Sequence, residues 1–160
     1  MERIVKQYGY DVLDINELSE EEMSDLLQAK RVRGEADTHV SNFGVGACLR
    51  MNNDVTSGGW NWENDVQNGL HAERNAIGRL HKNDRASGLK RVTVIGGFVD
   101  SVSEDPVAPC GDCRQDLMEL WGPGTEPMVI MAGIRGKIVR IRLEDLVPFM
   151  FDLNKYRPNK

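Results

Sequence analysis

The sequence predicts an α/β fold in which helices cover a single sheet. Five strand-like segments and three helix-like segments follow one another in the order α, β, β, α, β, α, β, β, and such alternation is typical of this architecture. The chain has 160 residues, and domains average roughly 150 residues. Apolar residues make up 40% and charged residues 28%, which excludes a disordered chain. We therefore expect one domain over residues 1–160.

The first predicted element is a helix that begins near Ser19. Ser19 and Glu22 have the spacing of a capping box, and Met23, Leu26 and Leu27 follow at helical spacing. Residues 32–40 are charged and contain a glycine, so a loop is expected there. No element other than this helix is predicted in the first 40 residues.

A hairpin is predicted next. Phe43–Met51 reads as a strand whose small residues invite close packing. Asn52–Asp54 is a turn signal, and Val55–Trp62 is expected to return as the second strand.

The remaining segments alternate between the helical and the strand pattern of apolar residues. A β-branched run typical of a buried strand lies between two helices. The predicted elements are a helix over Ala72–Lys82, a strand over Arg91–Phe98, a helix over Gly111–Trp121, strands over Met128–Ala132 and Lys137–Leu143, and a tail over Leu146–Lys160.

Charge and cysteine content exclude several classes of protein. Lys and Arg total 20 and Asp and Glu total 25, a net charge of −5, so neither nucleic acid nor an anionic membrane is an expected partner. No apolar run approaches the roughly 20 residues that span a bilayer, and Met1–Tyr10 has no signal-peptide core. Three cysteines are too few for a disulfide scaffold. A cytoplasmic location is expected.

Three metal-binding side chains stand at two predicted helix starts. His71 precedes one helix, and Cys110 and Cys113 open another. Two helix starts can lie side by side at one edge of a sheet, which would bring one nitrogen and two sulfurs together. Imidazole and thiolate suit Zn²⁺, and three protein ligands leave an open position, as in catalytic sites. Helix N-termini also favour the thiolate form.

Glu73 stands two residues after His71. A carboxylate beside a metal, but not bound to it, can accept a proton from water that the metal activates. The H-x-E and P-C-x-x-C motifs together are the signature of zinc deaminases, in which this Glu is the proton shuttle.

Other interpretations of these residues remain open. A C-x-x-C pair alone can be a redox pair or half of a four-cysteine structural site. Cys48 lies in a predicted buried strand and is expected to be a core residue. His39 and His81 have no ligand partners at suitable spacing and are expected on the surface.

Between residues 41 and 151 the sequence resembles the cytidine deaminase family, the free-nucleoside branch of the zinc deaminases. Four segments carry the resemblance. They are similar to family segments at Ser41–Ala47 (S-x-F-x-V-G-A), Asn61–Asn64 (N-x-E-N), Pro109–Gln115 (P-C-G-x-C-R-Q) and Leu146–Phe151 (L-L-P-x-x-F).

The resemblance implies a three-layer α/β/α sandwich on a five-stranded mixed sheet and a homotetramer. It also implies hydrolytic deamination of cytidine or deoxycytidine to the uridine form. His71, Cys110 and Cys113 would hold Zn²⁺, and Glu73 would move the proton.

The same resemblance assigns the substrate contacts. Asn61 and Glu63 would bind the ribose, chiefly its 3′-hydroxyl, and Phe43 would pack on the pyrimidine. Phe151 would reach into a neighbouring subunit's site. Arg74 matches an arginine that, in members with three cysteine ligands, offsets excess thiolate charge.

Some residues depart from the family pattern. His71 replaces the usual cysteine of small tetrameric members, and Trp60 and Trp62 are bulkier than usual. Alternative functions are therefore deamination of a modified or antibiotic nucleoside, as in the blasticidin-type enzymes, or editing of a polynucleotide. A zinc-stapled binding module without activity is the alternative outside the enzymes.

Overall fold

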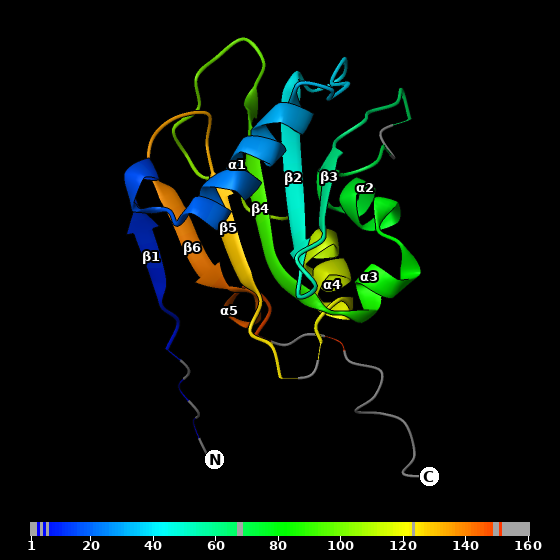
Figure 1. Cartoon of the computed structure of the whole chain (residues 1–160). Helices are drawn as coiled ribbons and strands as arrows, with labels where there is room; N and C mark the ends of the chain where they lie inside the picture. The colour runs from blue at the N-terminus through cyan, green and yellow to red at the C-terminus, as the bar shows by residue number, and fades with distance from the viewer. Residues whose placement is uncertain are drawn as a thin grey trace.

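A six-stranded sheet forms the middle layer of the described structure (Figure 1). This computed structural model describes residues 3, 5, 7–66, 69–122, 124–148 and 151. The strand order is β1-β6-β5-β4-β2-β3; β4 and β5 are parallel, and every other neighbouring pair is antiparallel. The strands are β1 (Tyr10–Leu13), β2 (Phe43–Met51), β3 (Thr56–Trp60), β4 (Leu89–Phe98), β5 (Met128–Ala132) and β6 (Ile138–Arg142).

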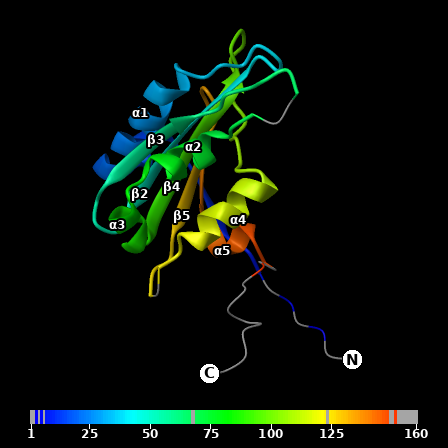
Figure 2. The ribbon, with the colours of Figure 1, turned by 90° about the vertical axis from the view of Figure 1, so that its right-hand side faces the viewer.

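Helices cover both faces of this sheet, which confirms the predicted fold class. Helix α1 lies on one face, and α2, α4 and α5 lie on the other (Figure 2). No helix among the described residues is long and apolar enough to cross a membrane. The bounds are α1 (Glu20–Arg33), α2 (Ala72–Arg79), α3 (Lys82–Ala86), α4 (Gly111–Glu119) and α5 (Leu143–Leu146), with a 3-10 turn η1 at Ile15–Glu17.

Helix α1 begins as the sequence predicts. The Ser19 hydroxyl accepts from the Glu22 amide at 3.2 Å, and the Glu22 carboxylate accepts from the Ser19 amide at 2.9 Å. The helix continues past its predicted end because Val32 is buried against the sheet. At Gly46, a Cβ would stand 2.1 Å from the carbonyl oxygen of Ala29, so this glycine allows α1 to lie directly on β2.

Helix α2 approaches the opposite face in the same way. A Cβ at Gly59 of β3 would stand 2.3 Å from the Ala72 carbonyl oxygen. The absence of a side chain there lets the first turn of α2 rest on the strand. This contact positions the N-terminus of α2, where His71 and Glu73 lie.

The sheet has six strands where the sequence predicted five. The additional strand, β1, pairs with β6 at one edge, and Arg140 of β6 holds it through Asp11 at 2.9 Å. Three of its four residues are exposed, so it lacks the apolar alternation that marks a strand in a sequence.

Several other bounds differ from the prediction. Ala72–Lys82 is not one helix, because the chain becomes extended at Leu80 and His81, whose ring then caps α3. Strand β3 ends at Trp60, so Asn61 and Trp62 lie beyond it. Helix α5 was not predicted, and of the predicted tail only 146–148 and 151 are described.

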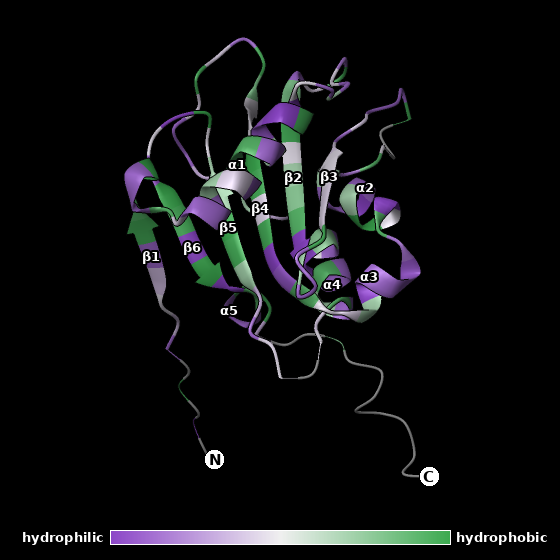
Figure 3. Cartoon of the chain, viewed as in Figure 1, coloured by the Kyte–Doolittle hydropathy of each residue, from purple (hydrophilic) through white to green (hydrophobic). Residues whose placement is uncertain are grey.

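The apolar core divides into one cluster on each face of the sheet. The central strands β2, β4 and β5 are mostly hydrophobic along their length (Figure 3). The larger cluster lies under α2, α4 and α5 and includes Leu49, Val94 and Leu117. The smaller cluster lies under α1 and includes Cys48, which is 1% exposed as expected of a core residue. The metal-binding motifs lie on the side of the larger cluster.

Candidate metal centre and substrate pocket

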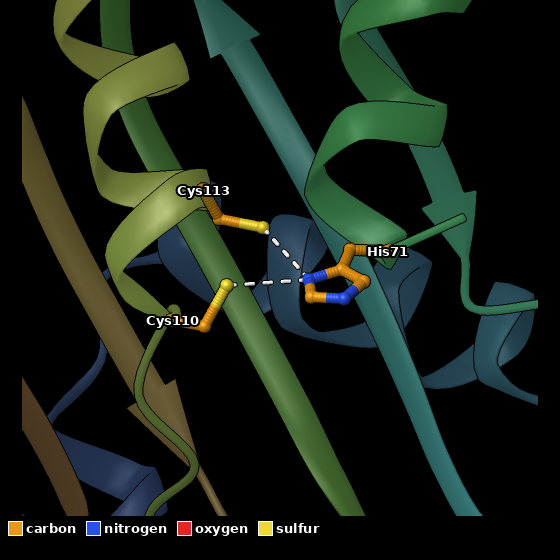
Figure 4. A group of neighbouring side chains, drawn as sticks. All are labelled: His71, Cys110 and Cys113. Atoms are coloured by element: carbon orange, nitrogen blue, oxygen red, sulfur yellow. Dashed lines mark hydrogen bonds between the residues drawn. The ribbon is translucent and has the colours of Figure 1, made fainter. Parts of the chain in front are cut away.

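The N-termini of α2 and α4 meet on the face opposite α1, and each presents a metal-binding side chain (Figure 4). His71 is the N-cap of α2 and Cys110 is the N-cap of α4. The Nδ1 atom of His71 lies 3.2 Å from the Cys110 sulfur and 3.3 Å from the Cys113 sulfur. The structure therefore brings together the three residues that the sequence singled out as ligands.

This donor set fits zinc. All three donor atoms lie within 4.8 Å of one another. Zinc bonds of about 2.0–2.3 Å place neighbouring donors roughly 3.5 Å apart in a tetrahedral site. One imidazole and two thiolates are ligands that Zn²⁺ prefers, and they would balance its charge.

The surroundings of Cys113 also favour a bound cation. This cysteine is fully buried, whereas His71 and Cys110 are exposed on the pocket side. Burial raises the pKa of the Cys113 thiol, and the neighbouring Glu73 carboxylate raises it further. A divalent cation between the sulfurs would offset both effects and favour the thiolate.

A cavity of about 620 Å³ opens beside the cluster. His71, Glu73 and Cys110 line it together with Val94 and Ala108. Glu73 lies in the first turn of α2 and is only 4% exposed. A buried carboxylate thus lines the cavity beside the candidate ligands.

Asn61 and Glu63 line the same cavity from the segment that follows β3. The Asn61 side chain bridges to β2: its oxygen accepts from the Val45 amide at 2.7 Å, and its nitrogen donates to the Phe43 carbonyl at 2.9 Å. The sequence predicted that Asn61 would lie in a strand over Val55–Trp62. Instead, β3 has already ended, and hydrogen bonds hold Asn61 in place.

Glu63 is held by the loop that precedes β2. Its Oε2 atom accepts from the amides of Val40 and Ser41 at 3.0 and 2.9 Å, and its Oε1 atom accepts from the Ser41 hydroxyl. Partial burial opposes ionisation, but these hydrogen bonds outweigh it and lower the pKa of Glu63. Glu63 is therefore an anion at neutral pH.

The remaining hydrogen-bonding capacity of this pair is complementary. Within the described contacts, Asn61 keeps one amide hydrogen and one lone pair of its oxygen, and Glu63 keeps one lone pair of Oε1. A hydroxyl group both accepts and donates, so it can satisfy the two groups at once. No Lys or Arg is found among the described residues of the cavity wall.

The other predicted contact residues lie in different surroundings. The Phe43 ring lines the cavity and packs edge-on against Phe98, with ring centroids 5.1 Å apart. Phe151 is outside the cavity wall, and its carbonyl accepts from the Gln115 side chain at 3.0 Å. Arg74 turns toward α4, where its Nε donates to Asp116.

Sequence reasoning missed some residues that shape the site. Ser41 was noted only as part of a motif, yet it donates to Glu63 through both its amide and its hydroxyl. His39 is exposed, as expected, but it joins Asp37 at 3.1 Å and Asp65 at 3.2 Å, linking the loop before β2 to the segment after β3. Its spacing to Asp37 was the only local signal, because Asp65 is distant in the chain.

Comparison with known proteins gives a consistent result. A family model described as the cytidine and deoxycytidylate deaminase zinc-binding region matches residues 19–130. The cytidine deaminase of Halalkalibacterium halodurans is 33% identical over 128 residues, which cover 79% of this chain and 90% of that protein. The cytidine deaminase of Sporosarcina psychrophila is 30% identical over 127 residues, 79% of this chain and 88% of the relative.

Solved structures show the same likeness. A cytidine deaminase from Burkholderia pseudomallei superposes with a TM-score of 0.66 at 29% identity, covering 80% of this chain and 97% of that one. A cytidine deaminase from Mycobacterium tuberculosis gives a TM-score of 0.63 at 27% identity, covering 81% and 95% of the two chains.

Proposed function

The chain belongs to the family of cytidine and deoxycytidylate deaminases, and on that premise we propose that it catalyses zinc-dependent hydrolysis of cytidine or deoxycytidine. Water adds across the N3–C4 bond of the base, and the C4 amine then leaves as ammonia, which gives the uridine form. The observation that carries the proposal is the buried Glu73 carboxylate, which lines one cavity with His71 and Cys110 of the metal cluster.

Each site residue has a role in this reaction. His71, Cys110 and Cys113 would hold the zinc ion. When bound, Zn²⁺ would act as a Lewis acid that lowers the pKa of water at its open position to about 7. Glu73 would take one proton from the attacking water and pass it to N3 of the base. It would then take the second proton from the new C4 hydroxyl group and pass it to the departing amine, which leaves as ammonia. Such proton transfer contributes about 10²- to 10⁴-fold to a rate.

The cavity wall supports a nucleoside rather than a nucleotide. The 5′-phosphate of deoxycytidylate would lie in a cavity whose described charged residues are Glu63 and Glu73, and where no Lys or Arg is described. The free donor of Asn61 and the free lone pair of Glu63 suit a 3′-hydroxyl, which an internal nucleotide of a polynucleotide lacks. Phe43 would supply an apolar contact to the pyrimidine ring.

We also infer a homo-oligomer in the cytoplasm. Apolar side chains are exposed around the cavity mouth, including Val40, Trp62 and Leu70, and such patches mark interaction sites. In a homotetramer, Phe151 would reach the site of a neighbouring subunit. Free thiols at Cys48, Cys110 and Cys113 suit a reducing compartment.

The test measures ammonia release by the zinc-loaded protein. The substrates are cytidine, deoxycytidine, 2′,3′-dideoxycytidine, free cytosine, deoxycytidylate and a cytosine-containing oligonucleotide, with the Glu73→Ala variant alongside. We expect release from cytidine and deoxycytidine, weaker release from the dideoxy compound, and none from the variant. Glu63→Gln should reduce kcat/KM about 10-fold or more for deoxycytidine, but change it little for the dideoxy compound, which has no 3′-hydroxyl.

Other outcomes would point elsewhere. Release from the oligonucleotide alone would indicate a polynucleotide deaminase. Activity only on modified nucleosides would indicate that Trp62 and its neighbours admit a larger substrate. If the zinc-loaded protein released no ammonia from any cytosine compound, the binding-module hypothesis would replace the enzyme.

A further inference from the structure

Arg74 joins the two helices that carry the metal cluster. It directly follows Glu73 in the first turn of α2. Its Nε donates to the Asp116 carboxylate, and its Nη1 lies 3.7 Å from Asp112. Asp112 and Asp116 stand one turn apart on α4, on either side of Cys113 in the sequence. One guanidinium therefore contacts two successive turns of the helix whose start holds both cysteines.

The position of Arg74 is unfavourable for its own helix. A cation in the first turn opposes the helix dipole, which favours acidic residues there. The side chain is also 40% exposed, so its ion pairs contribute little to overall stability. The stability of α2 does not explain a cation at this position, whereas the pairing with α4 does.

Offsetting excess thiolate charge does not explain Arg74 in this chain. With His71 as the third ligand, two thiolates already balance Zn²⁺, so the site carries no excess negative charge. Asp112 and Asp116 flank Cys113 in the sequence of α4, and Arg74 pairs with both carboxylates. Arg74 is placed to neutralise them and to hold α4 against α2.

We propose that Arg74 is a positioning residue that acts on the metal cluster through Asp116, setting the spacing between His71 on α2 and the two cysteines on α4. The inference rests on the proposed zinc site but not on the deaminase reaction. Outer partners of metal ligands typically change metal affinity by about 10- to 100-fold. Because this pair is partly exposed, we expect the lower end of that range.

The experiment measures release of zinc to a chelator and the visible absorption of the cobalt-substituted protein. We expect Arg74→Gln and Asp116→Asn each to speed zinc release about 10-fold and to shift the cobalt bands. The double variant should be no faster than either single one, because both remove the same interaction. Exchanging the charges, with Arg74→Asp and Asp116→Arg together, should return release to within about threefold of the unmodified protein.

Lys137→Gln is the matched control. Lys137 forms an exposed ion pair with Asp14, 2.7 Å away, at the β1–β6 edge of the sheet, and its loss should leave zinc release unchanged. Fast release in Arg74→Gln with normal release in Asp116→Asn would overturn the proposal, because Arg74 would then act on the thiolates directly. Normal release in both variants would also overturn it. Neither readout uses a substrate, so a failure of this proposal can be told apart from a failure of the proposed deaminase activity.

Discussion

Each face of the sheet buries an acidic side chain, but the surroundings of the two differ. The one under α1 is paired with cations, and the one under α2 faces a thiol. Under α1, Asp25 is 1% exposed and accepts from Arg50 and Arg91, each at 2.6 Å. Under α2, Glu73 is 4% exposed and faces the Cys113 thiol. In the described part of the chain, Glu73 forms no ion pair with a Lys or Arg.

The difference separates a stabilising role from a chemical one. The charge of Asp25 is compensated within the fold, so the network is complete before any ligand binds. The Glu73 carboxylate disfavours the charged form of the Cys113 thiol, which is costly unless a cation lies between them. The α1 face thus contributes to folding, while the α2 face keeps reactive groups ready for a metal and a substrate.

The largest expected effect comes from Glu73→Gln. This variant should lower kcat for cytidine by about 10²- to 10⁴-fold, because no carboxylate remains to move the proton. Its free energy of unfolding without metal should be unchanged or higher, because a buried anion without a cationic partner has been removed. Ammonia release and urea unfolding of the metal-free protein give the two quantities. A stability loss of several kcal/mol would contradict the contrast between the faces.

The reverse pattern is expected for Asp25→Asn. The variant removes the buried charge partner of Arg50 and Arg91 and leaves them only the more exposed Glu21, and breaking a buried pair in this way costs about 3–5 kcal/mol. The folded protein should keep its kcat and its zinc, since Asp25 lies on the far side of the sheet. Urea unfolding, zinc content and ammonia release at low temperature would measure this. A large fall in kcat of the folded variant would show that the two faces are coupled.

The sequence predicted those parts of the fold that rest on local signals. The capping box at Ser19 and the β-branched run of β4 depend on neighbours in the chain. Strand β1 does not, because its pairing needs Arg140 and β6 from the other end of the sequence. The break after α2 was missed because the cap formed by His81 is a weak signal in a run that otherwise suits a helix.

The site divides in the same way. His71, Cys110 and Cys113 could be singled out because helix starts are recognisable and the ligand types are specific. The bonds from Asn61 to Val45 and Phe43 depend on where β3 ends, and the pairing of Arg74 with Asp116 depends on how two helices meet. Contacts between segments that are distant in the chain cannot be predicted from local sequence signals. These contacts include the ones that orient the predicted site residues.

The smallest expected effect is on the α1 face, where the contribution of Glu21 to the free energy of unfolding depends on pH. Hydrogen bonds from Lys90 and Arg91 lower the pKa of Glu21 from 4.5 to about 2. Because the folded-state pKa lies below the unfolded one, ionised Glu21 stabilises the fold above about pH 4.5. That contribution is lost as the pH falls toward 2. Glu21 is 35% exposed, so solvent screening limits the contribution to about 1 kcal/mol.

Urea unfolding of the metal-free protein should therefore show Glu21→Gln about 1 kcal/mol less stable at pH 7, with a smaller deficit at about pH 3. Glu20→Gln alters the neighbouring exposed acid of the same helix turn and controls for the helix dipole. An equal, pH-independent deficit in both variants would mean that the ion pairs of Glu21 add nothing to the network around Asp25.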